Sequence, residues 1–132
     1  MKTKFTLPLA AIILLFLSYN HAVAQTASPR ATVEPQAYDF GDIGGDSTVT
    51  AYFLIKNAGT DTLHILSARA SCGCTAVLPD KRKLAPGETS SLKVSFNPKG
   101  KSGKQLKYVY LETDDPLNKR LKITIHANIT SN

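Results

Sequence analysis

The sequence predicts an all-β chain that forms a single immunoglobulin-like antiparallel β-sandwich of about seven strands. Apolar and polar residues alternate over 49–55, 91–96 and 121–129, which is the period of two expected of half-buried strands. Turn signals recur roughly every ten residues, as is typical of such sandwiches. The chain has only two cysteines among its 132 residues and no tryptophan, which excludes a disulfide-dense scaffold and the antibody-type core.

Seven or eight short strands account for most of the chain. In order, the expected extended segments are 31–34, 38–40, 49–55, 63–70, 75–78, 91–96, 105–111 and 121–129. In the segment 105–111 either two tyrosines or two aliphatic residues could face the core, so the orientation of this strand stays open. The competing residues are Tyr108 and Tyr110 against Val109 and Leu111.

Turn residues separate these segments. Gly41, Gly44 and Gly45 mark a turn region, and 57–59 (Asn-Ala-Gly) supplies residues that tolerate a positive φ. The pair Pro86-Gly87 suits the central positions of a type II turn.

The first 24 residues have the layout of a secretory signal peptide. Lys2 and Lys4 precede an apolar run of 11 residues over 7–17, and Ala22-Val23-Ala24 fits a small-x-small cleavage site. The run is shorter than the roughly 20 residues that a membrane-spanning helix needs. We therefore expect cleavage after Ala24, an exported (periplasmic or secreted) protein with no stable membrane span, a flexible leader over 25–30 and the sandwich domain over 31–132.

A set of short motifs, in a fixed order over about 33–129, resembles an exported bacterial domain family of unassigned function. The matching motifs are 40–44 (Phe-Gly-Asp-Ile-Gly), 57–59 (Asn-Ala-Gly), 71–75 (Ser-Cys-Gly-Cys-Thr), 86–88 (Pro-Gly-Glu), 96–98 (Phe-Asn-Pro) and 113–116 (Thr-Asp-Asp-Pro). The resemblance implies an immunoglobulin-like fold related to the major-sperm-protein type of sandwich, and an exported context. It implies no reaction and no catalytic residue.

The candidate redox or metal site is the pair Cys72 and Cys74. In an extended strand, residues two apart point to the same face, so the two sulfurs would lie side by side. Three interpretations remain open: a disulfide or redox-labile pair, favoured by an oxidising compartment; two thiolates that bind a soft ion such as Cu(I) or Zn(II); or two small structural thiols at a strand bend. Arg69 is close in sequence and would lower a thiol pKa if it were also close in space.

The positive charge is concentrated in the second half of the chain. Residues 25–80 carry 3 basic and 6 acidic groups, whereas residues 81–132 carry 11 basic and 4 acidic groups. A candidate basic patch consists of Lys99, Lys101, Lys104 and Lys107. These lysines either bind an anionic envelope component or an acidic protein, or they keep strand edges from pairing with other chains. Nucleic acid is not an expected partner, because the chain carries an export signal and no aromatic-rich binding motif.

No arrangement of residues with catalytic spacing is apparent, so we expect no enzyme activity and no cofactor. The sequence predicts a non-enzymatic, exported binding or structural module of the bacterial cell envelope or secreted fraction. Its partner would be an unknown protein or an anionic envelope component. The alternative is a thiol redox or Cu(I)-handling protein that acts through Cys72 and Cys74.

Overall fold

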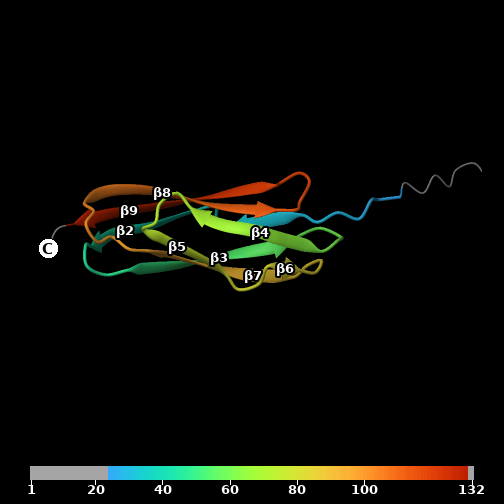
Figure 1. Ribbon diagram of the computed structural model, residues 1–132, viewed down its shortest axis with the longest axis horizontal. Helices are drawn as coiled ribbons and strands as arrows, with labels where there is room; N and C mark the ends of the chain where they lie inside the picture. Colours follow the sequence, from blue (N-terminus) through green and yellow to red (C-terminus); the bar gives the residue numbers. More distant parts are fainter. Residues whose placement is uncertain (1–23, 131–132) are drawn as a thin grey trace, which may run out of the picture.

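The structure is a computed structural model that describes residues 24–130. The expected signal peptide therefore lies, apart from Ala24, outside the described residues. The strands run along the long axis of the molecule (Figure 1). They are β1 (Ala31–Glu34), β2 (Ala37–Gly44), β3 (Val49–Asn57), β4 (Leu63–Ala70), β5 (Thr75–Pro79), β6 (Lys83–Leu84), β7 (Thr89–Phe96), β8 (Gly103–Thr113) and β9 (Arg120–Thr130). Within this part of the chain, no helix is long and apolar enough to cross a membrane.

The strands form two sheets, which confirms the predicted all-β sandwich. One sheet has the order β1-β3-β7-β5 and the other the order β2-β9-β8-β4-β6. The pairs are antiparallel with one exception, because β2 runs parallel to β9. The connection around Pro35 carries the chain from the first sheet to the second, so β1 and β2 belong to different layers.

The strand β2 is longer than the sequence indicates. It continues to Gly44, so Gly41 and Gly44 lie within a strand and not in the expected turn region. The pairing with β9 shifts register between Asp39 and Asp42, and Gly41 has a φ of 69° at this point. Glycine adopts this left-handed conformation without a steric cost, which is typical of a β-bulge.

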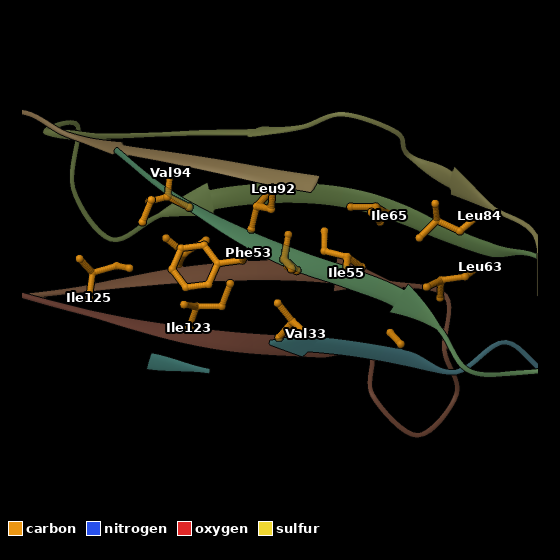
Figure 2. Packing of buried hydrophobic residues seen from close by; sticks show 14 residues of the cluster. Val33, Phe53, Ile55, Leu63, Ile65, Leu84, Leu92, Val94, Ile123 and Ile125 are labelled. Carbon is orange, nitrogen blue, oxygen red and sulfur yellow. The ribbon is translucent and has the colours of Figure 1, made fainter. Parts of the chain in front are cut away.

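The core lies between the two sheets and consists of the inward residues of the alternating strands (Figure 2). Phe53 and Ile55 of β3 pack there with Leu92 and Val94 of β7, and β9 contributes Ile123 and Ile125. Their side chains are at most 2 % exposed. Burying one such side chain contributes about 1.5–3 kcal/mol, so the alternation noted in the sequence is the main source of stability.

The structure also assigns the inward face of β8. Val109 and Leu111 are fully buried, while Tyr108 and Tyr110 lie on the outer face and are half-buried. The sequence did not predict β6, whose Leu84 pairs with Leu63 at the edge of the second sheet. The turn that follows β6 has the predicted type II geometry, since Gly87 has a φ of 79° and the Glu88 N–H donates to the Ala85 carbonyl (2.9 Å).

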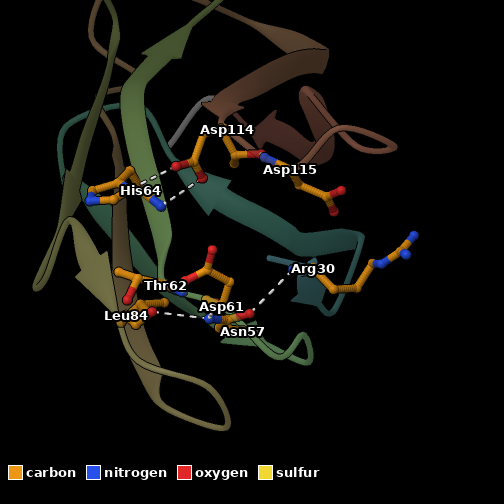
Figure 3. Close-up of polar contacts among 9 residues, drawn as sticks. Arg30, Asn57, Asp61, Thr62, His64, Leu84, Asp114 and Asp115 are labelled. Carbon is orange, nitrogen blue, oxygen red and sulfur yellow. Dashed lines mark hydrogen bonds and ion pairs between the residues drawn. The ribbon is translucent and has the colours of Figure 1, made fainter. Parts of the chain in front are cut away.

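The turn after β3 depends on close packing and not on the positive φ that we expected. In the described part of the chain, positive φ occurs only at glycines 41, 87, 100 and 103. A Cβ on Gly59 would lie 2.3 Å from the Ser28 carbonyl oxygen, so only glycine fits. The buried Asn57 holds the turn: its amide donates to the carbonyls of Asp61 (2.7 Å) and Leu84 (3.0 Å), and its Oδ1 accepts from the Arg30 N–H (Figure 3).

Residues 28–30, which we expected to belong to a flexible leader, contact this turn. The Thr60 N–H donates to the Ser28 carbonyl (2.9 Å), and the Ala58 N–H donates to the Arg30 carbonyl (2.8 Å). All three residues are partly buried, whereas residues 24–27 are exposed. The chain is therefore attached to the domain from Ser28 onward.

Two aspartates organise the connection between β8 and β9, at the same end of the molecule. Asp114 accepts hydrogen bonds from the His64 backbone N–H (2.8 Å) and pairs with His64 Nδ1 (2.6 Å; Figure 3). The buried Asp115 accepts from the N–H groups of Ala31 and Leu117, each at 2.8 Å. Burial raises the pKa of each carboxyl, but the hydrogen bonds to the charged form outweigh burial and leave the pKa below its ordinary value.

Candidate functional site

The outer face of the hairpin β8–β9 carries two tyrosines and two cations in close contact. Lys122 Nζ lies 5.1 Å from the centroid of the Tyr108 ring, and Arg120 Cζ lies 5.7 Å from that of Tyr110. Both distances are within the range of a cation–π attraction. Because Tyr110 pairs with Lys122 and Tyr108 with Thr124, each cation covers the tyrosine diagonal to it on the partner strand.

A third cation extends this surface onto β4. Arg69 pairs with Tyr110, and together with Ser67, Glu112 and Arg120 these residues line an open hollow of about 270 Å³. We call the surface formed by Arg69, Tyr108, Tyr110, Arg120 and Lys122 the Tyr–Arg face. Among the described residues, Glu112 is the one acidic residue that lines the hollow, and its Oε1 lies 2.6 Å from Arg120 Nε. The Arg120 side chain remains 67 % exposed in this pair.

The structure does not bring the four lysines of the predicted basic patch onto one face. Lys99 and Lys101 lie in the connection between β7 and β8, while Lys104 and Lys107 lie in β8 itself. Residues three apart in a strand point to opposite faces, so Lys104 and Lys107 cannot contact one ligand on the same side of the sheet. Lys107 is opposite the buried Ile125, which places it on the inner side.

Lys104 contributes to a second hollow, whose charges are mixed. This hollow, of about 380 Å³, is lined by Lys104, His126 and two carboxylates of β2, those of Asp39 and Asp42. Asp42 also accepts a hydrogen bond from the amide of Asn128 (2.7 Å). The two acidic side chains offset the positive charge of Lys104, so this hollow lacks the net positive charge of an anion site.

The cysteines lie in a turn between β4 and β5, so the two sulfurs meet through the turn and not through the side-chain alternation of an extended strand. Cys72 and Cys74 are joined by a disulfide, with their Cα atoms 5.3 Å apart. Ser71 continues the ladder between β4 and β8, because its N–H donates to the Tyr108 carbonyl (2.8 Å) and its Oγ accepts from the Tyr108 N–H (3.0 Å). Thr75 Oγ1 lies 3.7 Å from Cys72 Sγ and 3.8 Å from Cys74 Sγ.

These positions bear on the chemical alternatives for the pair. In the disulfide form neither sulfur is a thiolate, so the hypothesis of Cu(I) or Zn(II) binding applies only to a reduced protein. Residues 24–130 contain no group of three or more His, Cys, Asp or Glu side chains arranged to hold a metal ion. Arg69 lines the hollow of the Tyr–Arg face, on the outer side of the sheet.

The sequence could not identify the Tyr–Arg face, because the orientation of the segment 105–111 was open. The missing information is the register of β8 and β9. Once Val109 is placed opposite the inward Ile123, Tyr110 must face outward opposite Lys122. The turn residues 114–116, at the start of the connection between the two strands, are the signal from which this register could be proposed.

The chain belongs to a known protein family. The family described as "Protein of unknown function (DUF1573)" matches residues 31–129. No curated protein matches the sequence.

Solved structures share the fold at low sequence identity. A protein of unknown function from Porphyromonas gingivalis W83 has a TM-score of 0.71 and 21 % identity, over 83 % of this chain and 51 % of that one. The PapD-like domain 7 of human CEP192 has a TM-score of 0.63 and 14 % identity, over 87 % of this chain and 97 % of that one. The periplasmic chaperone SfaE has a TM-score of 0.59 and 6 % identity, over 76 % of this chain and 57 % of that one. The chain thus spans about half of the Porphyromonas protein, and these similarities establish an immunoglobulin-like, PapD-like fold alone.

Proposed function

We propose that the protein is an exported, non-enzymatic binding module that recognises an anionic glycan of the bacterial envelope through the Tyr–Arg face. The observation that carries the proposal is the convergence of Arg69, Arg120 and Tyr110 around one open hollow. The layout of residues 1–24 supports export, and a fold shared with a periplasmic chaperone is compatible with it.

The chemistry of this face fits an acidic sugar. A guanidinium group donates two parallel hydrogen bonds to a carboxylate or phosphate, and Arg69 and Arg120 approach the hollow from two different strands. The electron-rich face of Tyr110 holds the Arg120 guanidinium group beside the hollow, and the phenol hydroxyl of Tyr110 is a donor and acceptor suited to sugar hydroxyl groups. An open hollow on a sheet suits a flat polymer better than a small molecule, which usually needs an enclosed pocket.

Binding to immobilised polygalacturonate, with dextran as the neutral control, tests the proposal. We expect retention on the acidic polymer that weakens at high ionic strength, because exposed charges are screened by salt. The double variant Arg69→Gln/Arg120→Gln should bind about tenfold more weakly or worse, since each guanidinium loses charge-assisted hydrogen bonds.

A matched variant separates this site from general charge attraction. Lys83→Gln/Lys93→Gln removes the same charge from exposed positions outside the Tyr–Arg face, in β6 and β7. Tyr110→Ala should also weaken binding, because Tyr110 lines the hollow. Its control is Tyr52→Ala, because Tyr52 is exposed on β3 of the other sheet. If both double variants lose the same binding affinity, the interaction is general charge attraction and not a defined site. If the protein binds acidic proteins but not the acidic polymer, the partner is a protein and not a glycan.

A further inference from the structure

The bridge between Cys72 and Cys74 contributes little to holding the fold together. A disulfide stabilises a protein mainly by restricting the unfolded chain, and this effect decreases with the length of the loop that it closes. Here the two cysteines are separated by one residue, Gly73, and belong to the same turn. The stability of the sandwich therefore does not explain why two sulfurs are placed there.

The backbone of the turn is fixed on both sides by hydrogen bonds that do not involve the sulfurs. Ser71 pairs with Tyr108 in β8, and the Asn97 N–H donates to the Cys74 carbonyl (2.8 Å). Within the turn, the Thr75 N–H donates to the Cys72 carbonyl (3.3 Å). None of these hydrogen bonds has a sulfur as donor or acceptor, so reduction of the disulfide breaks none of them directly.

The two sulfurs differ in their surroundings. Cys74 packs against a buried cluster formed by Phe96, Ala127 and Ile129. Gly73 between the cysteines is exposed, and in the described part of the chain no atom outside residues 72–74 lies within 4 Å of the point where its Cβ would be. The turn is therefore open to an approaching chain at Gly73. Cys72 is partly buried and is not among the residues that pack against this cluster.

Thr75 supplies a hydroxyl group to both sulfurs. Its Oγ1 lies within 4 Å of each Sγ, and its side chain is buried, so the hydroxyl is held in place. An O–H that donates to a thiolate stabilises the charged form.

We propose that the Cys72–Cys74 disulfide is a thiol–disulfide exchange site that oxidises a cysteine pair of another protein. The partner thiolate attacks Cys72 Sγ, a mixed disulfide forms, and the bond to Cys74 breaks and leaves Cys74 as a thiolate that accepts the hydrogen bond from Thr75. The second partner thiol loses its proton to solvent and attacks the partner sulfur of the mixed disulfide, which releases Cys72. Two electrons pass from the partner to the domain, the partner gains the disulfide, and the two cysteines take up protons from solvent.

The test uses the oxidised protein and a synthetic peptide with two reduced cysteines, with alkylation and mass spectrometry of both at timed points. We expect one peptide disulfide to appear for each Cys72–Cys74 bridge that is reduced. Thr75→Val has nearly the same shape and should slow the exchange roughly threefold to tenfold, because one hydrogen bond to the leaving thiolate is lost. Thr75→Ser keeps the hydroxyl and should restore the rate.

The free disulfide peptide Ser-Cys-Gly-Cys-Thr and a stability measurement serve as controls. Reduction of the bridge should leave the midpoint of urea unfolding almost unchanged. Reduction of a disulfide that stabilised the fold would instead lower this midpoint. Three results would each overturn the proposal: exchange no faster than that of the free peptide, equal rates for Thr75→Val and the native protein, or unfolding of the domain upon reduction. Binding to acidic glycans does not depend on this bridge, so the two proposals fail independently.

Discussion

The backbone N–H of Ala31 donates a 2.8 Å hydrogen bond to Oδ2 of Asp115, although 84 residues separate them in the sequence. Ala31 begins β1 in the four-stranded sheet, and Asp115 lies in the connection between β8 and β9 in the other sheet. The same carboxylate accepts from Leu117 and Asn118. One buried side chain thus joins the two layers at the end where the chain enters the domain.

We expect Asp115→Asn to lower the free energy of unfolding by about 1–3 kcal/mol. The amide replaces one acceptor oxygen with a donor, so either the buried N–H of Ala31 or the partly buried N–H of Leu117 loses its partner. Urea unfolding monitored by circular dichroism measures the loss. Asp80→Asn is the control, because Asp80 is exposed, and equal effects of the two substitutions would contradict the role of Asp115.

Stability should decrease as the pH falls below about 4. The pKa values of Asp114 and Asp115 are lower in the folded protein than the ordinary value of about 3.9, so the unfolded chain binds protons first. Their contribution is complete above the pKa of the unfolded state and is lost as the pH falls through the pKa of the folded state. Free energies of unfolding between pH 5 and pH 2 measure this dependence.

The variant Asp114→Asn/Asp115→Asn provides the control for this pH dependence. It should be less stable at pH 7 but lose less stability on acidification. Glu88, whose pKa is lowered by its contacts with Lys81 and the Ala85 N–H, retains part of the dependence. An unchanged slope would show that other carboxylates dominate acid unfolding.

Gly59→Ala should destabilise the domain by about 1–3 kcal/mol, because the new Cβ would overlap the backbone of residues 28–30. Thermal unfolding followed by calorimetry measures this loss. Gly73→Ala is the matched control, since no described atom outside residues 72–74 lies within 4 Å of its Cβ position. If both substitutions have the same small effect, residues 28–30 do not pack against the turn as described.

The mature protein should begin at Gln25. Signal peptidases cleave after small residues, and Ala22 and Ala24 occupy the required positions. Intact mass spectrometry of the protein from the extracellular or periplasmic fraction of a bacterial host tests this. A mass that includes residues 1–24 would contradict cleavage, and substitution of Ala24 with a bulky residue should block it.

The long strands were predictable because burial imposes a regular pattern on them. In β3, β7 and β9 the buried residues occupy every second position, and the sequence alternates accordingly. The strand β6 has two residues, too few for any period, and its position depends on the distant Leu63. The parallel pairing of β2 with β9 likewise joins the two ends of the domain and has no local signal.

The candidate sites were predictable only in part. The sequence identified Cys72 and Cys74, but the anchors of their turn are Tyr108 and Asn97, which are remote in sequence. The Tyr–Arg face was missed because tyrosine suits either side of a half-buried strand, and only pairing with β9 decides its orientation. The lysines counted as one patch lie close in sequence, yet alternation along β8 places two of them on opposite faces.

The strand β4 leads from the end of the molecule where the chain enters the domain to the cysteine turn. The turn before it contacts Ser28 and Arg30, where the chain enters the domain, and Cys72 and Cys74 follow its other end. Its eight residues span about 25 Å. If the protein were tethered to a surface through the residues that precede Ser28, β4 would hold the cysteine turn away from that attachment, where it could reach proteins that the tethered end cannot.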